Sequence, residues 1–203
     1  MTTIRHHLAA HSLLSFAAGS LPGALAAVAA AHLAMCADCR RELVLFEHIG
    51  GALLEGLPAV PLADSEPALP PAAAAAGGGP DNPILAHARQ DFAGVAWRRI
   101  GIGLWHRPLP LPGKGSVQLI KAAPGASVPD HGHAGAELTL VLRGALIDAT
   151  GRYGPGDIAD LDEEVEHSPV ADANAGCICA VANERPTRFH SLLARLLQPW
   201  HGL

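Results

Sequence analysis

The chain has 203 residues and a formal net charge of -5, and charged residues make up 16% of it against 49% hydrophobic residues. This length suits one large domain or two small ones. The Lys and Arg residues form no block, so the chain lacks the basic stripe with which proteins follow a phosphate backbone. These features argue against direct binding to DNA or RNA and favour a protein partner or a small ligand.

An alanine-rich apolar run after Arg5 has the look of a signal peptide. Gly19, Ser20, Pro22 and Gly23 interrupt this run, however, and leave it too broken to span a membrane. Helical periodicity instead predicts one helix that stops at Gly19 and a second, over residues 24–34, that starts after Ser20. We therefore expect no membrane segment.

A third helix is predicted from Asp38 onward, where an acidic residue favours a helix N-terminus. It carries Leu43, Phe46, Leu53 and Leu54 as its apolar residues. Three short helices in about 55 residues bury little apolar surface, and domains of this size commonly use a metal for stability.

The junction of the second and third helices holds His32, Cys36 and Cys39. Residues spaced by four and by three share one side of helical turns, so these side chains can converge on one tetrahedral zinc ion. The first helix offers three candidates for the fourth ligand, namely His6, His7 and His11. A closed site with two thiolates is structural, because no position remains for a substrate. The alternative is two buried free cysteines with solvated histidines.

Residues 57–83 are dense in Pro, Ala and Gly and show no apolar periodicity. We interpret them as a linker between a helical domain of residues 1–56 and a second domain of residues 84–203. The linker is expected to isolate two separate cores, and residues 72–76 are at most the remnant of a further helix.

The second domain is predicted to be all-β, with strands near residues 116–120, 138–144 and 177–182 that are separated by Gly and Pro turns. Such closely spaced strands suggest a barrel or jelly roll. His131, His133 and Glu137 share one parity, so on an extended chain they face the same side, and His167 can complete the set from a later strand. The alternative is a group of buried histidines satisfied by carboxylates and backbone.

Cys177 and Cys179 lie two residues apart on one predicted strand, which makes them a candidate redox pair. The alternative is a structural role, because cysteine often serves as a small buried hydrophobe and this spacing is near the upper limit for a disulfide. Four locally paired cysteines are too few for a disulfide scaffold, so we expect a reducing, cytoplasmic location.

Two strings resemble a known family. Leu13, Phe16, Gly19 and Leu21, followed by His32-Leu33-x2-Cys36-x2-Cys39-Arg40, resemble the zinc-binding anti-sigma domain of ChrR-type anti-sigma factors. Residues 125–144 match the first cupin motif, and Gly156-Asp157 with His167 match part of the second. The resemblance implies a small zinc-braced helical bundle followed by an all-β cupin barrel, which is a two-domain α+β fold.

The resemblance also implies the ligands. It assigns His7 as the fourth zinc ligand of the helical domain, with His6 as the fallback. It assigns His131, His133, Glu137 and His167 to a cupin metal, which is zinc in the family. Three imidazoles and one carboxylate also suit iron or manganese.

Two functions are therefore considered. In the first, the helices sequester an extracytoplasmic-function sigma factor, and the cupin domain senses an oxidative, singlet-oxygen-like stress that releases it. In the second, the cupin is a metal-dependent dioxygenase or isomerase with a helical regulatory domain. The His-x3-Cys-x2-Cys appendage favours the first, because a cupin enzyme has no need of it. We expect a regulator without catalytic residues.

Overall fold

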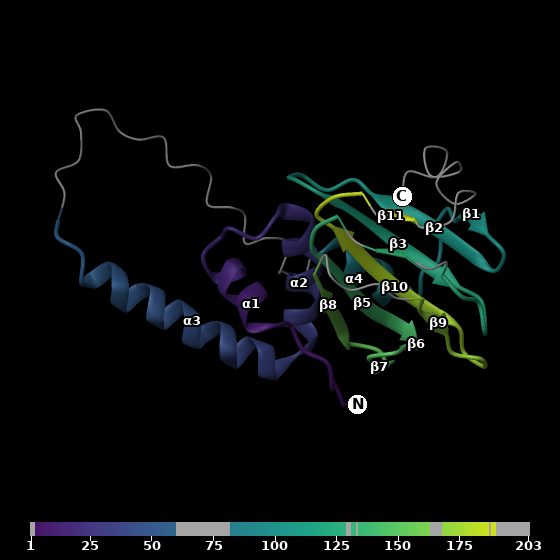
Figure 1. Ribbon diagram of the computed structural model, residues 1–203, viewed down its shortest axis with the longest axis horizontal. Coiled ribbons are helices and arrows are strands. Elements are labelled where there is room, and N and C mark those ends of the chain that lie inside the picture. The colour runs from purple at the N-terminus through teal and green to yellow at the C-terminus, as the bar shows by residue number, and fades with distance from the viewer. Residues whose placement is uncertain are drawn as a thin grey trace.

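The computed structural model describes residues 3–59, 82–128, 131–132, 134–162, 168–186 and 188–189. Helices occupy the N-terminal part of the chain and strands the C-terminal part (Figure 1). The helices are α1 (Ala10–Ala17), α2 (Gly23–Met35), α3 (Ala37–Glu55) and α4 (Pro83–Arg89). The strands are β1 (Arg98–Gly101), β2 (Leu104–Leu109), β3 (Ser116–Ala122), β4 (His131–Gly132), β5 (Glu137–Gly144), β6 (Leu146–Asp148), β7 (Gly151–Tyr153), β8 (Ile158–Leu161), β9 (Val170–Ala171), β10 (Cys177–Asn183) and β11 (Arg188–Phe189).

The first two helices begin and end close to the predicted positions. Gly19 follows α1 with φ at +67°, a left-handed conformation that glycine adopts without strain. Pro22 is the N-cap of α2, and its missing N–H costs nothing there. Gly23 must stay small, because a Cβ on it would lie 2.8 Å from the carbonyl oxygen of Pro112.

Cys36 separates α2 from α3, and its sulfur accepts the backbone N–H of Cys39 at 3.5 Å. It thus takes the place that a serine or aspartate side chain usually has at a helix N-terminus. Asp38 lies in the first turn of α3, as predicted. Because the two helices meet at one residue, the side chains of residues 32, 36 and 39 are held at a sharp corner of the chain.

A fourth helix, α4, follows the predicted linker. The Asn82 side chain caps it by accepting the backbone N–H groups of Ile84 and Leu85. The same side chain donates to the carbonyl oxygen of Ala27 in α2 at 3.1 Å. The buried Asn82 therefore fixes α4 against α2. The expected helical remnant at residues 72–76 lies outside the described residues.

The strands form a six-stranded sheet in the order β1-β2-β3-β10-β5-β8, with antiparallel neighbours throughout. The smaller sheet β7-β6-β9 and the pair β11-β4 accompany it. The strands predicted near residues 116–120, 138–144 and 177–182 are β3, β5 and β10, which are adjacent in the large sheet. The overall α+β class is therefore confirmed, whereas the prediction of an all-β second domain is wrong at its start, because α4 occupies Pro83–Arg89.

The large sheet has two apolar faces. On one face, Leu119, Leu138 and Ala180 belong to a core that also contains Leu25 and Val28 of α2. The opposite face, which we call the barrel interior, carries a second core. Its residues from the large sheet are Leu104, Ala122, Val141, Ala159, Leu161, Cys177, Cys179 and Val181. The alternation along each strand thus divides its side chains between the helices and the interior.

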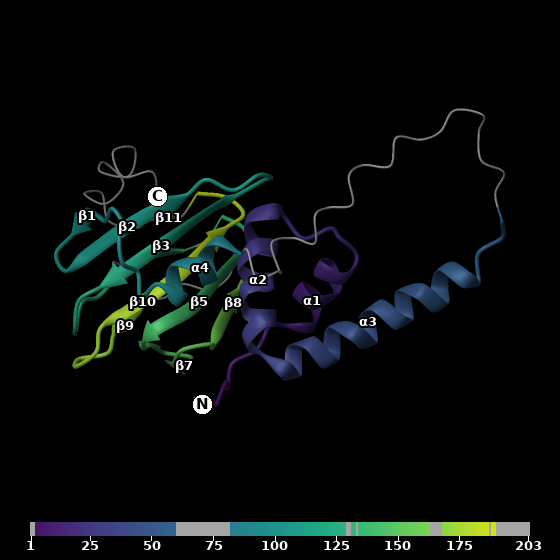
Figure 2. The same ribbon diagram turned by 180° about the vertical axis from the view of Figure 1, so that it is seen from behind.

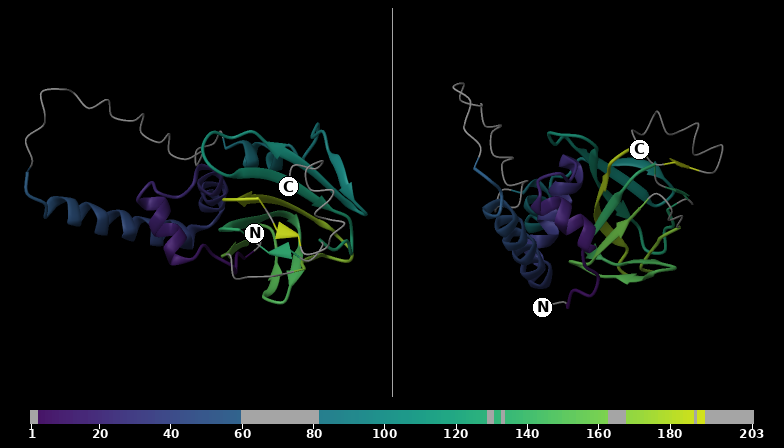
Figure 3. Two further views of the ribbon diagram at one scale, coloured as in Figure 1. Left: turned by 45° about the horizontal axis from the view of Figure 1, so that its top comes forward. Right: turned by 60° about the vertical axis from the view of Figure 1, so that its left-hand side comes forward.

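Helix α2 packs against this sheet, and every residue from Ala24 to Leu33 is buried. Two views show α2 between the sheet on one side and α1 and α3 on the other (Figures 2 and 3). The expectation of two isolated cores is therefore wrong, because one apolar core joins residues of α2 to β3, β5 and β10. A helix that is apolar all round must be covered on all sides, and the sheet supplies part of that cover.

No helix of the described part of the chain combines the length and the apolar character that crossing a membrane requires.

Candidate metal centre

Four side chains converge where α2 meets α3. His7 comes from the extended segment before α1, His32 from the last turn of α2, Cys36 from the N-cap of α3 and Cys39 from its first turn. One potential ligand atom from each lies within 4.8 Å of every other. The structure thus brings together the predicted set of two histidines and two cysteines.

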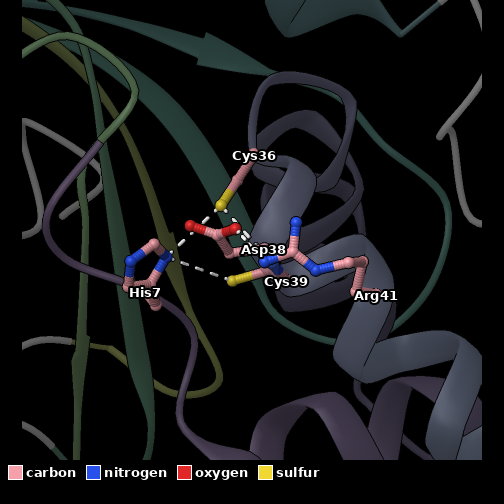
Figure 4. Close-up of polar contacts among 5 residues, drawn as sticks. All are labelled: His7, Cys36, Asp38, Cys39 and Arg41. Atoms are coloured by element: carbon pink, nitrogen blue, oxygen red, sulfur yellow. Dashed lines mark hydrogen bonds and ion pairs between the residues drawn. The ribbon is translucent and has the colours of Figure 1, made fainter. Parts of the chain in front are cut away.

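The spacing of these atoms matches a tetrahedral zinc site. His32 Nε2 lies 3.2 Å from Cys39 Sγ, and His7 Nδ1 lies 3.3 Å from Cys36 Sγ and 3.6 Å from Cys39 Sγ. Figure 4 shows the His7 ring turned toward both sulfurs. Zinc bonds of about 2.0–2.3 Å place tetrahedral ligands about 3.3–3.8 Å apart. Three of the six separations between ligand atoms therefore lie in or close to this range, and all six are at most 4.8 Å, so the four side chains can close around a zinc ion.

The protonation state and the orientation of the His32 ring suit metal coordination. It is fully buried, and burial is the main cause that lowers its pKa to about 4, so the ring is neutral at neutral pH. Its Nδ1 lies 2.9 Å from the carbonyl oxygen of Gly156. A carbonyl accepts only from a protonated nitrogen, so Nδ1 carries the proton and the lone pair of Nε2 faces the cluster.

Burial also raises the pKa of Cys39, to about 12, because an isolated thiolate is unfavourable away from water. A bound dication reverses this preference, since it stabilises the thiolate that coordinates it. The donor set is therefore suited to a soft, strongly bound cation. When bound, zinc would supply a cross-link between the N-terminal segment, α2 and α3.

The structure separates the three candidates for the fourth ligand. His6 and His7 precede α1 on an extended segment, so the expectation that the first helix carries them is wrong. Successive residues of an extended chain point to opposite sides. His7 accordingly faces the cysteines, whereas the His6 ring stacks on Tyr153 with ring centroids 4.1 Å apart. His11 lies in α1 and faces Asp160 at 4.0 Å, with an exposed side chain.

This arrangement makes the three histidines distinguishable by experiment. Loss of a hydrogen-bond partner of a metal ligand typically lowers metal affinity about 10- to 100-fold. His7→Ala removes a ligand itself, so it should lower zinc affinity by more than that. His6→Ala and His11→Ala serve as matched controls and should leave the affinity nearly unchanged. Competition with a chromophoric chelator measures all three, and equal losses would contradict the assignment of His7.

The predicted cupin ligands are only partly described. Glu137 begins β5 and is buried, and its Oε1 accepts the hydroxyl of Thr139 at 3.0 Å. The backbone of His131 lies in β4, while His133 and His167 lie outside the described residues. The four-ligand cupin site therefore stays a prediction.

Two further buried polar residues lie on the interior side of the sheet, and the sequence did not predict them as part of a site. His106 on β2 is fully buried, and its Nδ1 lies 3.0 Å from Oε1 of the buried Gln118 on β3. His106 alternates with the more exposed Trp105 and Arg107 on β2, and that alternation was the available signal, whereas Gln118 lies between buried residues of β3. The pair adds buried polar groups to the face that carries Glu137.

Cys177 and Cys179 are free thiols buried in the barrel interior. A hydrogen bond with Cys177, together with burial, raises the pKa of Cys179 well above its ordinary value. Reactive cysteines are exposed and have a lowered pKa. These surroundings favour the structural alternative, and the redox role stays a prediction.

Comparison with known proteins extends over nearly the whole chain. Residues 86–186 match the family model described as the ChrR Cupin-like domain. The chain is 38% identical over 209 residues to the anti-sigma-E factor ChrR of Cereibacter sphaeroides, with 98% of each chain covered. It also resembles a chain in the crystal structure of Rhodobacter sphaeroides SigE in complex with the anti-sigma ChrR. That match has a TM-score of 0.73 at 38% identity and covers 89% of this chain and 99% of the other. This chain therefore belongs to the ChrR family of anti-sigma factors.

Proposed function

We propose that this protein is an anti-sigma factor that sequesters an extracytoplasmic-function sigma factor through its zinc-braced helices. The exposed apolar surface of α3 supports this proposal. Leu45, Ile49 and Leu53 recur every fourth residue and are 56%, 47% and 69% exposed. An exposed apolar row of this kind marks a surface that a protein partner covers.

The shape of the molecule supports the same proposal. The first half of α3 is packed against the other helices by Leu43 and Phe46, whereas its second half extends away from the body of the molecule (Figure 1). Leu54 and Leu57 add further exposed apolar side chains at this free end. An exposed helix with these residues can lie in the groove of a partner.

Substitution of the exposed row tests this interface. Leu53→Asp should weaken binding to the cognate sigma factor by about 30-fold or more, the effect of losing a central interface residue. Ile102→Asp is the matched control, since Ile102 is 90% exposed but lies between β1 and β2. Calorimetric titration measures both variants, and equal effects, or none for Leu53→Asp, would contradict the role of α3.

For the organisation of the chain, we propose that residues 1–56 bind the sigma factor, residues 57–83 form a linker and residues 84–203 sense the stress signal. The function is regulatory, and the cytoplasm, where bacterial transcription takes place, is the proposed location.

Release of the sigma factor on oxidative, singlet-oxygen-like stress would begin at a zinc, iron or manganese ion held by His131, His133, Glu137 and His167. The buried carboxylate of Glu137 supports this part of the proposal.

Removing the cupin ligands separates inhibition from sensing. His131→Ala combined with Glu137→Ala should empty the cupin site and leave sigma binding intact, so that inhibition persists without a response to singlet oxygen. Transcription from a sigma-dependent promoter, measured with and without photosensitised singlet oxygen, reports both properties. A double variant that still responds would remove the cupin metal from the proposed mechanism.

A further inference from the structure

The N-terminal segment that carries His7 is attached to the cupin domain rather than to the helices alone. Oδ1 of Asp157 accepts the backbone N–H groups of Arg5 at 2.6 Å and His6 at 3.0 Å. The backbone N–H of Ile158 donates to the carbonyl oxygen of His6 at 3.3 Å. These contacts fix the backbone up to the residue before the ligand His7.

The other oxygen of Asp157 holds the turn that precedes β8. Its Oδ2 accepts the backbone N–H of Gly154 at 2.7 Å. Within the same turn, Gly156 presents its carbonyl oxygen to His32. Gly156 has φ at +94°, and a Cβ on it would lie 2.8 Å from the side chain of Ile4, so this position requires glycine. The turn at residues 154–157 therefore contacts both histidine ligands or their neighbours: Asp157 binds the backbone next to His7, and Gly156 binds the His32 ring.

We propose that Asp157 is a positioning residue for the zinc site, acting on His7 through the backbone of residues 5 and 6 and on His32 through the turn at Gly156. The inference rests on the proposed zinc site. Without the carboxylate, two backbone amides next to His7 and one amide of the turn lose their acceptor. The histidine ligands would then have to be ordered by the metal itself, and the cost of this ordering lowers zinc affinity.

The same strand connects this turn to the barrel interior. Asp157 directly precedes β8, and Leu161 at the other end of β8 pairs in register with Glu137 on β5. Asp160 of β8 gives a further contact, since its Oδ2 accepts the backbone N–H of Ala9 at 2.9 Å. A change at the Leu161 end of β8 therefore has a continuous route of contacts to the zinc ligands, and a change there that alters zinc affinity requires that zinc binding alter β8 by the same free energy.

The test measures zinc affinity in the full chain by chelator competition. Asp157→Ala should lower the affinity about 10- to 100-fold. Asp172→Ala is the matched control, because Asp172 also accepts two backbone amides in a turn, those of Asn174 and Ala175, but lies in the segment between β9 and β10. That control should leave zinc affinity unchanged even where it lowers the melting temperature. A folded Asp157→Ala variant with the affinity of the unchanged protein would overturn the inference, as would an equal loss in the control.

Asp157→Asn covers the case in which the alanine variant does not fold. It keeps one carbonyl oxygen for the amides of residues 5 and 6, so its zinc affinity should lie between those of the unchanged protein and the alanine variant. An asparagine variant with unchanged affinity would then overturn the inference. If the unchanged protein itself bound no zinc, the proposed zinc site would fail, which is a distinct outcome.

Hydrogen exchange provides a readout that does not depend on affinity. Removing zinc with a chelator should speed amide exchange in a peptide covering residues 154–161, where Ile158 donates to His6. A peptide covering β3 should keep its exchange rate. Unchanged exchange in both peptides would show that zinc does not act on β8, contrary to the inference.

Discussion

Replacing Cys36 or Cys39 with serine is expected to abolish zinc binding and, with it, sigma binding. Structural zinc sites with thiolate ligands contribute about 10–16 kcal/mol of binding free energy, and this energy is available only to the folded state. The cross-linked parts are the N-terminal segment, α2 and α3. Because α2 is also held by the sheet, we expect the loss of order to be concentrated in α1 and α3.

The helical content of the variants, measured by circular dichroism, and their affinity for the sigma factor check this result together. Cys177→Ser is the matched control, since Cys177 is equally buried but lies in the barrel interior. It should keep zinc in the helical site and keep sigma binding. A Cys36→Ser protein that stays fully helical and inhibits transcription would show that the cluster is not a structural zinc site.

The second large effect concerns the core that α2 shares with the sheet. Leu25 is 1% exposed and belongs to the same core as Leu119 and Leu138. Leu25→Ala should lower the free energy of unfolding by about 2–5 kcal/mol, because it removes buried apolar surface and leaves a cavity. Since the core is continuous, the zinc site and the sheet should lose stability together.

Two probes of unfolding separate a common transition from two independent ones. Cobalt in place of zinc reports the cysteine site by its thiolate absorption. With Trp97 and Trp200 replaced by phenylalanine, tryptophan fluorescence reports the sheet through Trp105 on β2. Both midpoints should fall by the same amount in Leu25→Ala. Leu57→Ala is a suitable control because Leu57 is 65% exposed, and it should shift neither. A fall in only one of the two midpoints would mean that the two parts unfold independently.

Much of the fold follows from local sequence patterns. The strands β3, β5 and β10 were predictable because short apolar runs bounded by turn residues are local signals. Helix α2 was predictable from its run of alanine, leucine and valine. Its packing against the sheet was not, because a helix without a polar face has no preferred side, and its partner residues lie about a hundred positions further along the chain.

The metal centre was likewise predictable only where its residues are close together in the sequence. The spacing of His32, Cys36 and Cys39 predicted three members of the cluster, while the choice of His7 over His6 depends on which side of an extended segment faces the cluster. No local pattern connects that segment to Asp157, which lies 152 residues after Arg5. Contacts of this kind depend on the tertiary fold, which local periodicity does not encode.

Co-expression of this chain with the extracytoplasmic-function sigma factors of its own genome shows whether its zinc-braced helices sequester a sigma factor. The purified material is analysed at once for zinc content and for complex formation by size-exclusion chromatography. We expect a stable complex with one of them, containing zinc bound by the helical part of the chain, and loss of that complex in Cys39→Ser. A zinc-loaded, folded chain that forms no complex with any of these sigma factors would contradict this expectation.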